Sequence, residues 1–118
     1  MASSRCVGGS LDTDLADRLR EVLARGDTTE AGLRELTGEA DRWVSRLEAE
    51  TLTSERRLRR LNADPRSPIA EIADELRLAE ALRTQLREAR DLLDDLDERA
   101  RELRTEWLLR QSEARPAS

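Results

Sequence analysis

The chain has 118 residues, of which 40% are charged, 37% are hydrophobic and only 2% are aromatic, and its formal net charge is −5. This length fits one domain, but so few large apolar side chains cannot fill a thick core. The negative charge also disfavours nucleic acid or an anionic membrane as a partner for the whole surface, because both require a basic face.

Lys and His are absent, so all 21 basic residues are Arg. Without His the chain lacks the usual general base and a common zinc ligand, and without Lys it lacks a Schiff-base nucleophile. We therefore predict no enzyme activity and no catalytic, cofactor-binding or metal-binding residues. Acidic side chains gather at Asp91, Asp94, Asp95, Asp97 and Glu98. We expect them to form a solvated, ion-paired helix face, with a metal or acidic docking site as the alternative.

Cys6 is the single cysteine, which suits a reducing compartment such as the cytosol or nucleus. No apolar run approaches the roughly 18 residues of a membrane span, and residues 1–4 do not begin a signal peptide. We therefore expect a soluble, intracellular protein in the cytoplasm or nucleus.

Residues 1–10 are small, polar and glycine-bearing, which predicts a flexible leader. Apolar residues then recur at spacings of three and four, which predicts a helix over residues 11–25 that ends at a left-handed Gly26. Two acid–base pairs one turn apart are expected to stabilise it, Asp14 with Arg18 and Glu21 with Arg25.

A second helix is predicted over residues 29–62, with Asp27, Thr28 and Thr29 as its start signal. Its apolar stripe is close to a heptad repeat with one stutter near Trp43, whose ring we expect to fill the core. The stripe comprises Leu33, Leu36, Ala40, Trp43, Val44, Leu47, Leu58 and Leu61, with a polar step at Thr51 and Ser54.

Pro65 ends the second helix, Ser67 is the predicted cap of a third helix, and Pro68 suits its first turn. This third helix is predicted over residues 68–110, followed by a flexible tail over residues 111–118. Its expected seam is Ile69, Ile72, Leu76, Ala79, Leu82, Leu86, Ala89, Leu93, Leu96, Ala100, Leu103 and Trp107.

The short turn at Pro65 makes the two long helices antiparallel neighbours. If facing residues lie equally far from Pro65, apolar positions mostly meet apolar ones, as in Leu61 with Ile69, Leu58 with Ile72, Thr51 with Ala79, Val44 with Leu86, and Leu33 with Leu96. The predicted fold is therefore all-α: a long antiparallel, coiled-coil-like helical hairpin with a shorter N-terminal helix, forming one domain over residues 11–110.

A second apolar line on the third helix is not covered by the hairpin, so we expect other helices to complete a bundle. The residues predicted to bind a partner are Leu78, Leu92, Leu103, Trp107, Leu108 and Leu109. For Trp107 two covers remain open. The N-terminal helix could continue in line with the second helix and place Leu23 against Trp107 and Val22 against Leu108, or a partner chain could supply the contact, which we favour.

A basic run at the end of the second helix is a possible docking patch, formed by Arg56, Arg57, Arg59, Arg60 and Arg66. Arginines near a helix C-terminus also complement the helix dipole, which is the simpler interpretation. No aromatic side chain interrupts the run, and this weakens a single-stranded nucleic-acid interpretation.

The sequence therefore predicts a non-enzymatic structural subunit or adaptor that assembles through coiled-coil contacts. Other helical subunits are the expected partners, with a hetero-oligomer favoured over a homo-oligomer, and nucleic acid or membrane is not expected. The alternatives are a basic-patch module for nucleic acid or an acidic protein, and a small phage or bacterial regulator of scaffolding or antitoxin-like type.

Overall fold

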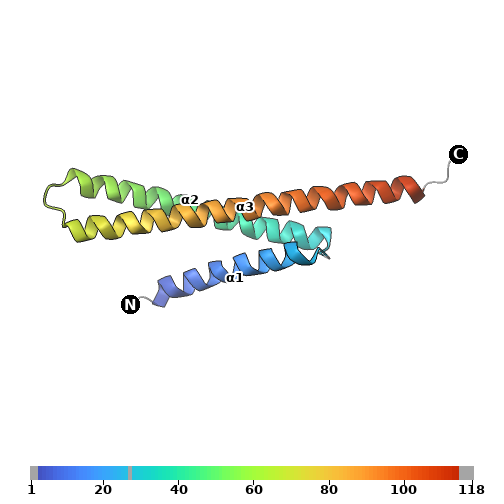
Figure 1. Ribbon diagram of the computed structural model, residues 1–118, viewed down its shortest axis with the longest axis horizontal. Helices are drawn as coiled ribbons and strands as arrows, with labels where there is room; N and C mark the ends of the chain where they lie inside the picture. The colour runs from blue at the N-terminus through green and yellow to red at the C-terminus, as the bar shows by residue number, and fades with distance from the viewer. Residues whose placement is uncertain (1–2, 27, 115–118) are drawn as a thin grey trace. The chain divides into compact units, whose positions relative to one another are not determined.

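The computed structural model describes the backbone of residues 3–26 and 28–114, and the side chains of residues 14–26 and 28–113. Over this range the chain is all-α, with helices α1 (Ser3–Arg25), α2 (Glu30–Ala63) and α3 (Ile69–Ala114) and no strand (Figure 1). The two long helices pack against each other in antiparallel order and α1 is shorter. The predicted fold class, a helical hairpin preceded by a shorter helix, is confirmed.

The helix ends differ from the predicted ones mainly at the two ends of the chain. α1 begins at Ser3 and not at residue 11, and α3 continues to Ala114 and not to residue 110. Leader residues 3–10 and tail residues 111–114 contain no proline. Each helix can therefore continue through them, because every added residue forms a further backbone hydrogen bond. The rest of the predicted leader and tail, residues 1–2 and 115–118, lies outside the described residues.

The connection between α1 and α2 follows the predicted chemistry. Gly26 has a φ of 71°, the left-handed conformation expected after a helix end, and its N–H donates to the Val22 carbonyl at 3.2 Å. Thr29 caps α2, because its hydroxyl accepts the Gly32 N–H at 3.0 Å and its carbonyl accepts the Leu33 N–H at 2.9 Å. These contacts satisfy backbone groups that a helix terminus leaves without intrahelical partners.

The turn between α2 and α3 is held by Asp64. Its carboxylate accepts the Arg66 N–H at 2.9 Å, and its carbonyl accepts the Ser67 N–H at 3.1 Å. The Pro68 carbonyl accepts the Ile72 N–H at 3.2 Å, so Pro68 lies at the start of α3 where its missing N–H breaks no helical bond.

The chain divides into two compact units, each of which has its own core. Unit 1 comprises Met1–Asp41 and Asp91–Ser118, and unit 2 comprises Arg42–Arg90. The boundary falls inside both long helices, so unit 2 is the part of the hairpin nearest the turn. The sequence had indicated one domain over residues 11–110.

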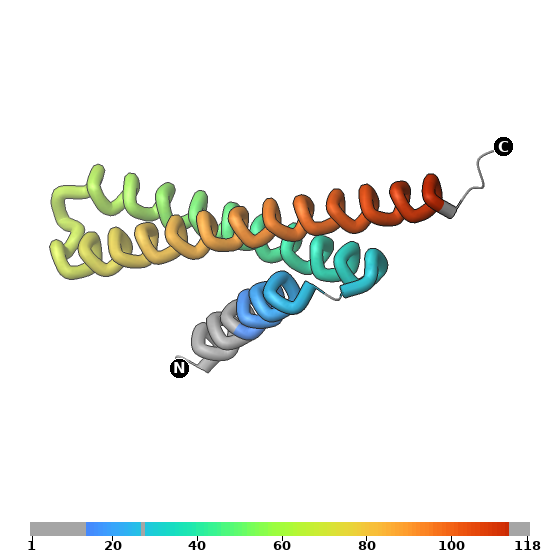
Figure 2. Tube along the Cα trace, turned by 45° about the vertical axis from the view of Figure 1, so that its right-hand side comes forward, coloured from blue at the N-terminus to red at the C-terminus, as the bar shows by residue number. Residues whose placement is uncertain are grey.

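Unit 1 combines parts of all three helices. α1 turns back at Gly26 so that it runs beside the start of α2 (Figures 1 and 2). Arg18 of α1 pairs with Glu39 of α2 at 2.7 Å, and Arg99 of α3 donates to the Gly26 carbonyl at 2.5 Å. The buried apolar side chains of this unit are Leu15, Ala16, Leu19, Leu33, Ala40, Leu92 and Leu96.

Two predicted details of unit 1 have different outcomes. The Glu21–Arg25 pair forms at 2.6 Å and is confirmed. Arg18, which we expected to pair with Asp14 one turn before it, instead reaches the next helix and pairs with Glu39. A long guanidinium side chain can bridge to a packed neighbouring helix as easily as it can follow its own, so tertiary packing decided between two acidic partners.

Unit 2 is the hairpin itself, formed by the second half of α2 and the first half of α3. Trp43 is buried, as predicted, although its indole N–H has no hydrogen-bond partner among the described residues. The predicted polar step is also present, because Thr51 and Ser54 are buried with the apolar side chains. The other buried residues of this unit are Val44, Leu47, Glu75, Ala79, Leu82, Leu86 and Ala89.

The predicted seam of α3 is wrong near the turn. Ile69 is 84% exposed and Leu76 is 43% exposed, whereas Glu75, next to Leu76, is buried. Ile69 is the first residue of α3 and lies beyond the last well-packed turn of the hairpin, so the predicted Leu61–Ile69 contact does not cover it. At Leu76 the helix is rotated by one residue relative to the predicted seam, and a carboxylate occupies the interior position.

We predict that Gly26→Ala destabilises the chain by about 1–2 kcal/mol, since a side chain at a left-handed φ is strained. Gly26→Asn is the matched control and should cost less, because asparagine tolerates this conformation. Chemical denaturation followed by circular dichroism measures both. Equal stability of the wild type and Gly26→Ala would contradict the assigned conformation.

Candidate partner-binding surfaces

The C-terminal end of α3 is the most exposed apolar part of the described chain. Trp107, Leu108 and Leu109 are 56%, 57% and 58% exposed, and every other side chain over residues 104–113 is exposed as well. Ion pairs here are local, such as Arg110 with Glu106 at 3.8 Å, one turn apart on the same helix. Nothing else among the described residues covers this helix end.

The structure sorts the six predicted partner residues into three groups. Trp107, Leu108 and Leu109 lie together and exposed, Leu78 and Leu103 are half-buried, and Leu92 is buried. The expectation that Leu92 needs a cover from outside was wrong, because Leu92 is already buried in unit 1, to which all three helices contribute. Leu92 therefore does not belong to the exposed surface.

The internal cover considered for Trp107 is also wrong. It required α1 to continue in line with α2, whereas α1 turns back at Gly26 and pairs with α2 through Arg18 and Glu39 (Figure 1). Val22 and Leu23 are half-buried in that arrangement, and Trp107 remains more than half exposed. The described chain thus contains no cover for this aromatic side chain.

The three exposed residues do not lie on one face of the helix. Consecutive residues of an α-helix point in directions about 100° apart, so Trp107, Leu108 and Leu109 together span more than half of the circumference. A single packed helix covers only one stripe of its neighbour. Covering all three side chains therefore requires at least two neighbouring helices, as in the interior of a bundle.

A polar cluster occupies the seam of unit 2. The Ser54 hydroxyl donates to Glu75 Oε2 at 3.0 Å, and Arg57 Nη1 donates to Glu75 Oε1 at 3.0 Å. Ser54 is 2% exposed and Glu75 is 6% exposed, so the carboxylate lies inside the hairpin with both oxygens bonded. The Thr51 hydroxyl is also buried, but it donates to the Leu47 carbonyl of its own helix at 2.7 Å.

One residue of the predicted basic patch, Arg57, belongs to this polar cluster. Arg57 is directed to Glu75 and helps to hold the hairpin together. Arg56, Arg59, Arg60 and Arg66 are exposed and stay near the turn, as expected from the sequence. The basic patch therefore consists of four exposed arginines and of Arg57, which is half exposed and also bonded to Glu75.

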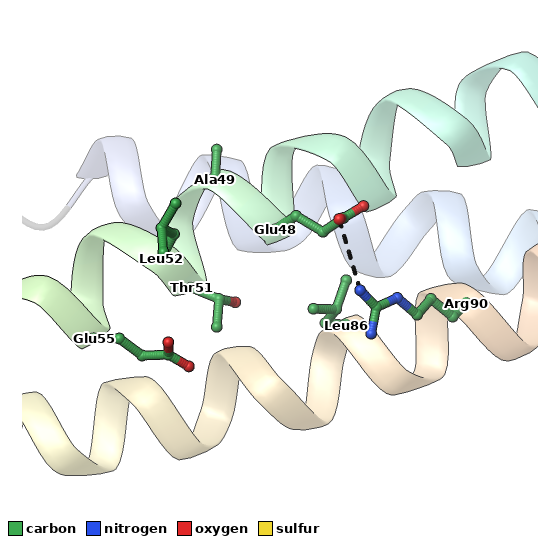
Figure 3. Close-up of a pocket in the computed structure, with 7 residues that line it drawn as sticks. All are labelled: Glu48, Ala49, Thr51, Leu52, Glu55, Leu86 and Arg90. Atoms are coloured by element: carbon green, nitrogen blue, oxygen red, sulfur yellow. Dashed lines mark ion pairs between the residues drawn. The ribbon is translucent and has the colours of Figure 1, made fainter.

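A groove in unit 2 was missed at the sequence level. Its volume is about 380 Å³, and it is lined by Glu48, Ala49, Thr51, Leu52, Glu55, Leu86 and Arg90 (Figure 3). Thr51 and Leu86 project into the space between the helices, whereas Ala49 and Leu52 lie on the other side of α2 in this view. The ion pairs Glu48–Arg90 at 3.7 Å and Glu55–Arg83 at 3.5 Å link the two helices here.

Leu52 is the residue in this groove that the sequence could have identified. It is 44% exposed, and it immediately follows Thr51, which the heptad pattern places in the seam. A residue next to a seam position can point outward, as Leu52 does beside Thr51 and as Leu76 does beside Glu75 on α3. The groove is open and shallow, so it could receive side chains of another protein but could not enclose a small molecule.

The described part of the chain has no group of three or more Asp, Glu or Cys side chains arranged to hold a metal ion. Within that part, no helix combines the length and the apolar character needed to cross a bilayer. The acidic run of α3 is mostly exposed, and Glu98 pairs with Arg101 at 3.5 Å.

Comparisons with protein-family models, with curated proteins and with solved structures found no match to this chain.

We predict that Glu75→Ala destabilises the hairpin by about 1–3 kcal/mol, because the buried Ser54 hydroxyl loses its acceptor. The ion pair with Arg57 contributes little to this figure, since that guanidinium is half exposed and screened by solvent. Glu71→Ala, at an exposed position one turn earlier, is the control and should change stability by less than about 0.5 kcal/mol. Equal urea midpoints for the two variants would contradict the buried contact.

Proposed function

We propose that this protein is a non-enzymatic structural subunit or adaptor that assembles with other helical proteins through helical-bundle contacts. The observation that supports this most is the end of α3, where Trp107, Leu108 and Leu109 are exposed around the helix. A tryptophan with adjacent leucines is typical of the anchors that contribute most to protein–protein binding. Exposed apolar patches of this kind commonly mark interaction sites.

The geometry favours partner helices over an extended peptide or a flat surface. Around Trp107, α3 has no backbone edge to offer to a strand, since the N–H and C=O groups there are used within the helix. Its side chains point in several directions, which suits insertion between two or more helices of a partner. The half-buried Leu103 continues the stripe from the core of unit 1 toward Trp107, so the partner helices would extend that core.

Different proteins are the favoured partners, although a second copy of this chain is also possible in the proposed arrangement. We place the assembly inside the cell, in the cytoplasm or nucleus, on the basis of the single cysteine. The open groove beside Leu52 offers a further apolar contact in unit 2. No part of this proposal requires chemistry on a substrate.

A second candidate function is docking of an acidic protein segment at the four exposed arginines near the turn. Arg56, Arg59, Arg60 and Arg66 are exposed, and they lie close together in sequence at the end of the hairpin. A basic cluster on an otherwise acidic protein attracts an acidic partner selectively. It would act together with the helical contacts of α3 and not in place of them.

Trp107→Ala should weaken assembly by about 2 kcal/mol or more while leaving helicity nearly unchanged, because the ring is exposed within the chain. The experiment isolates the complex of the tagged full-length chain and measures its mass by size-exclusion chromatography with light scattering. Thr105→Ala, at an exposed position near the same helix end, is the matched control. A variant that assembles normally but loses helicity would show that Trp107 belongs to the core of the chain.

Arg56→Glu with Arg60→Glu should not alter binding to mixed-sequence DNA or RNA, because the net charge of −5 leaves little general affinity to remove. Fluorescence anisotropy at several salt concentrations measures this binding for the wild type and the variant. Salt-sensitive binding by the wild type that the variant loses would instead support a nucleic-acid function.

A further inference from the structure

In the seam of unit 2, two polar residues are buried while the leucine that follows each of them is exposed. On α3 the buried position belongs to Glu75 while the next residue, Leu76, is 43% exposed. On α2 the buried position belongs to Thr51 while the next residue, Leu52, is 44% exposed. A hairpin selected for stability alone would bury the leucines, because a buried carboxylate loses its hydration and must be fully bonded to be tolerated.

The apolar part of the seam does not by itself define how the helices align. In unit 2 its buried residues are Trp43, Val44 and Leu47 on α2, and leucine or alanine on α3. Shifting one helix past the other by seven residues again places apolar positions opposite each other, with Trp43 then level with Leu93 or Ala79. The short turn opposes such a shift within one chain. It does not oppose pairing of α2 of one molecule with α3 of another after the hairpin opens.

The polar cluster does distinguish these arrangements. Ser54 donates to Glu75 at 3.0 Å only when these two residues are level with each other. A shift of seven residues would place Glu75 opposite Leu47 or Leu61, and in one direction Ser54 opposite Leu82. Each outcome leaves a buried carboxylate or hydroxyl without its partner on the other helix, which buried polar groups in proteins rarely lack.

We infer that Ser54 and Glu75 form a register lock, a polar layer that selects one alignment of α2 and α3 and keeps Leu52 and Leu76 outside the seam. A single polar layer in an otherwise apolar coiled coil has this effect, at some cost in stability. Arg57 completes the layer from the edge by bonding the second carboxylate oxygen at 3.0 Å. The lock acts within the chain and does not depend on the function proposed above.

Thr51 is the control position for an experiment on the polar layer. It is a buried hydroxyl in the same seam, but its hydrogen bond goes to Leu47 on its own helix at 2.7 Å. This hydrogen bond therefore does not depend on the alignment of α2 with α3. Replacing Thr51 removes a polar group from the seam without removing the contact between the helices.

The test compares three variants of the full-length chain by amide NMR spectra and light scattering. Ser54→Leu with Glu75→Leu should keep or raise the melting temperature, yet give additional amide resonances or a mass that rises with concentration. Thr51→Leu should give one set of resonances and the wild-type mass. Ser54→Glu with Glu75→Ser transposes the two groups, so it should retain a bond between the helices and one set of resonances.

Several results would overturn the register lock. One is a double-leucine variant with a single set of resonances and the mass of the wild type. Another is a Thr51→Leu variant that shows as many additional species as the double-leucine variant, because any polar-to-apolar change would then have the same effect. If the double-leucine variant fails to fold, multiple species in the transposed variant would equally contradict it.

Discussion

The buried carboxylate of Glu75 determines how the hairpin of unit 2 is built. Both of its oxygens are bonded at 3.0 Å, one by Ser54 and one by Arg57, so that the charge is tolerated inside a thin core. Its position sets the rotation of α3 near the turn and, with it, which side chains reach solvent. Leu76 is exposed because Glu75, the residue before it, occupies the interior position.

The exposed apolar residues follow from how few helices the chain has. Two packed helices bury one stripe each, and a third helix adds cover only where it reaches. Unit 1 contains parts of all three helices and buries residues such as Leu92, but the end of α3 has no cover among the described residues. The proposed role as a subunit of a larger helical assembly would explain the exposed apolar residues, because partner helices would complete the bundle around Trp107.

Much of the fold could be predicted from the sequence because it depends on local signals. Gly26 ends α1 in the left-handed conformation, Thr29 caps α2, and the prolines near residue 65 separate the two long helices. Periodicity also identified the buried stripe of α2, including Trp43 and the polar step. Each of these features involves residues within one or two turns of each other, where propensity and capping rules apply.

The features that were missed depend on contacts between distant parts of the chain. Hydrophobic periodicity placed Leu76 in the seam, since leucine is more hydrophobic than glutamate. No local signal indicates that Ser54 and Arg57 of α2 lie opposite Glu75 and bond its carboxylate. The direction of α1 after Gly26 was equally open, because one glycine permits both an in-line and a folded-back path. Both outcomes decided which candidate partner residues are exposed.

The rotation of α3 at Glu75 can be measured directly by nuclear Overhauser contacts between side chains in the isotope-labelled chain. The structure predicts contacts between the Ser54 and Glu75 side chains across the seam and none between Ser54 and the Leu76 methyl groups. Strong contacts from Leu76 to Ser54 or Thr51, without contacts from Glu75, would show that the leucine and not the carboxylate occupies the seam. That result would remove the basis for the polar layer and for the exposed surface beside it.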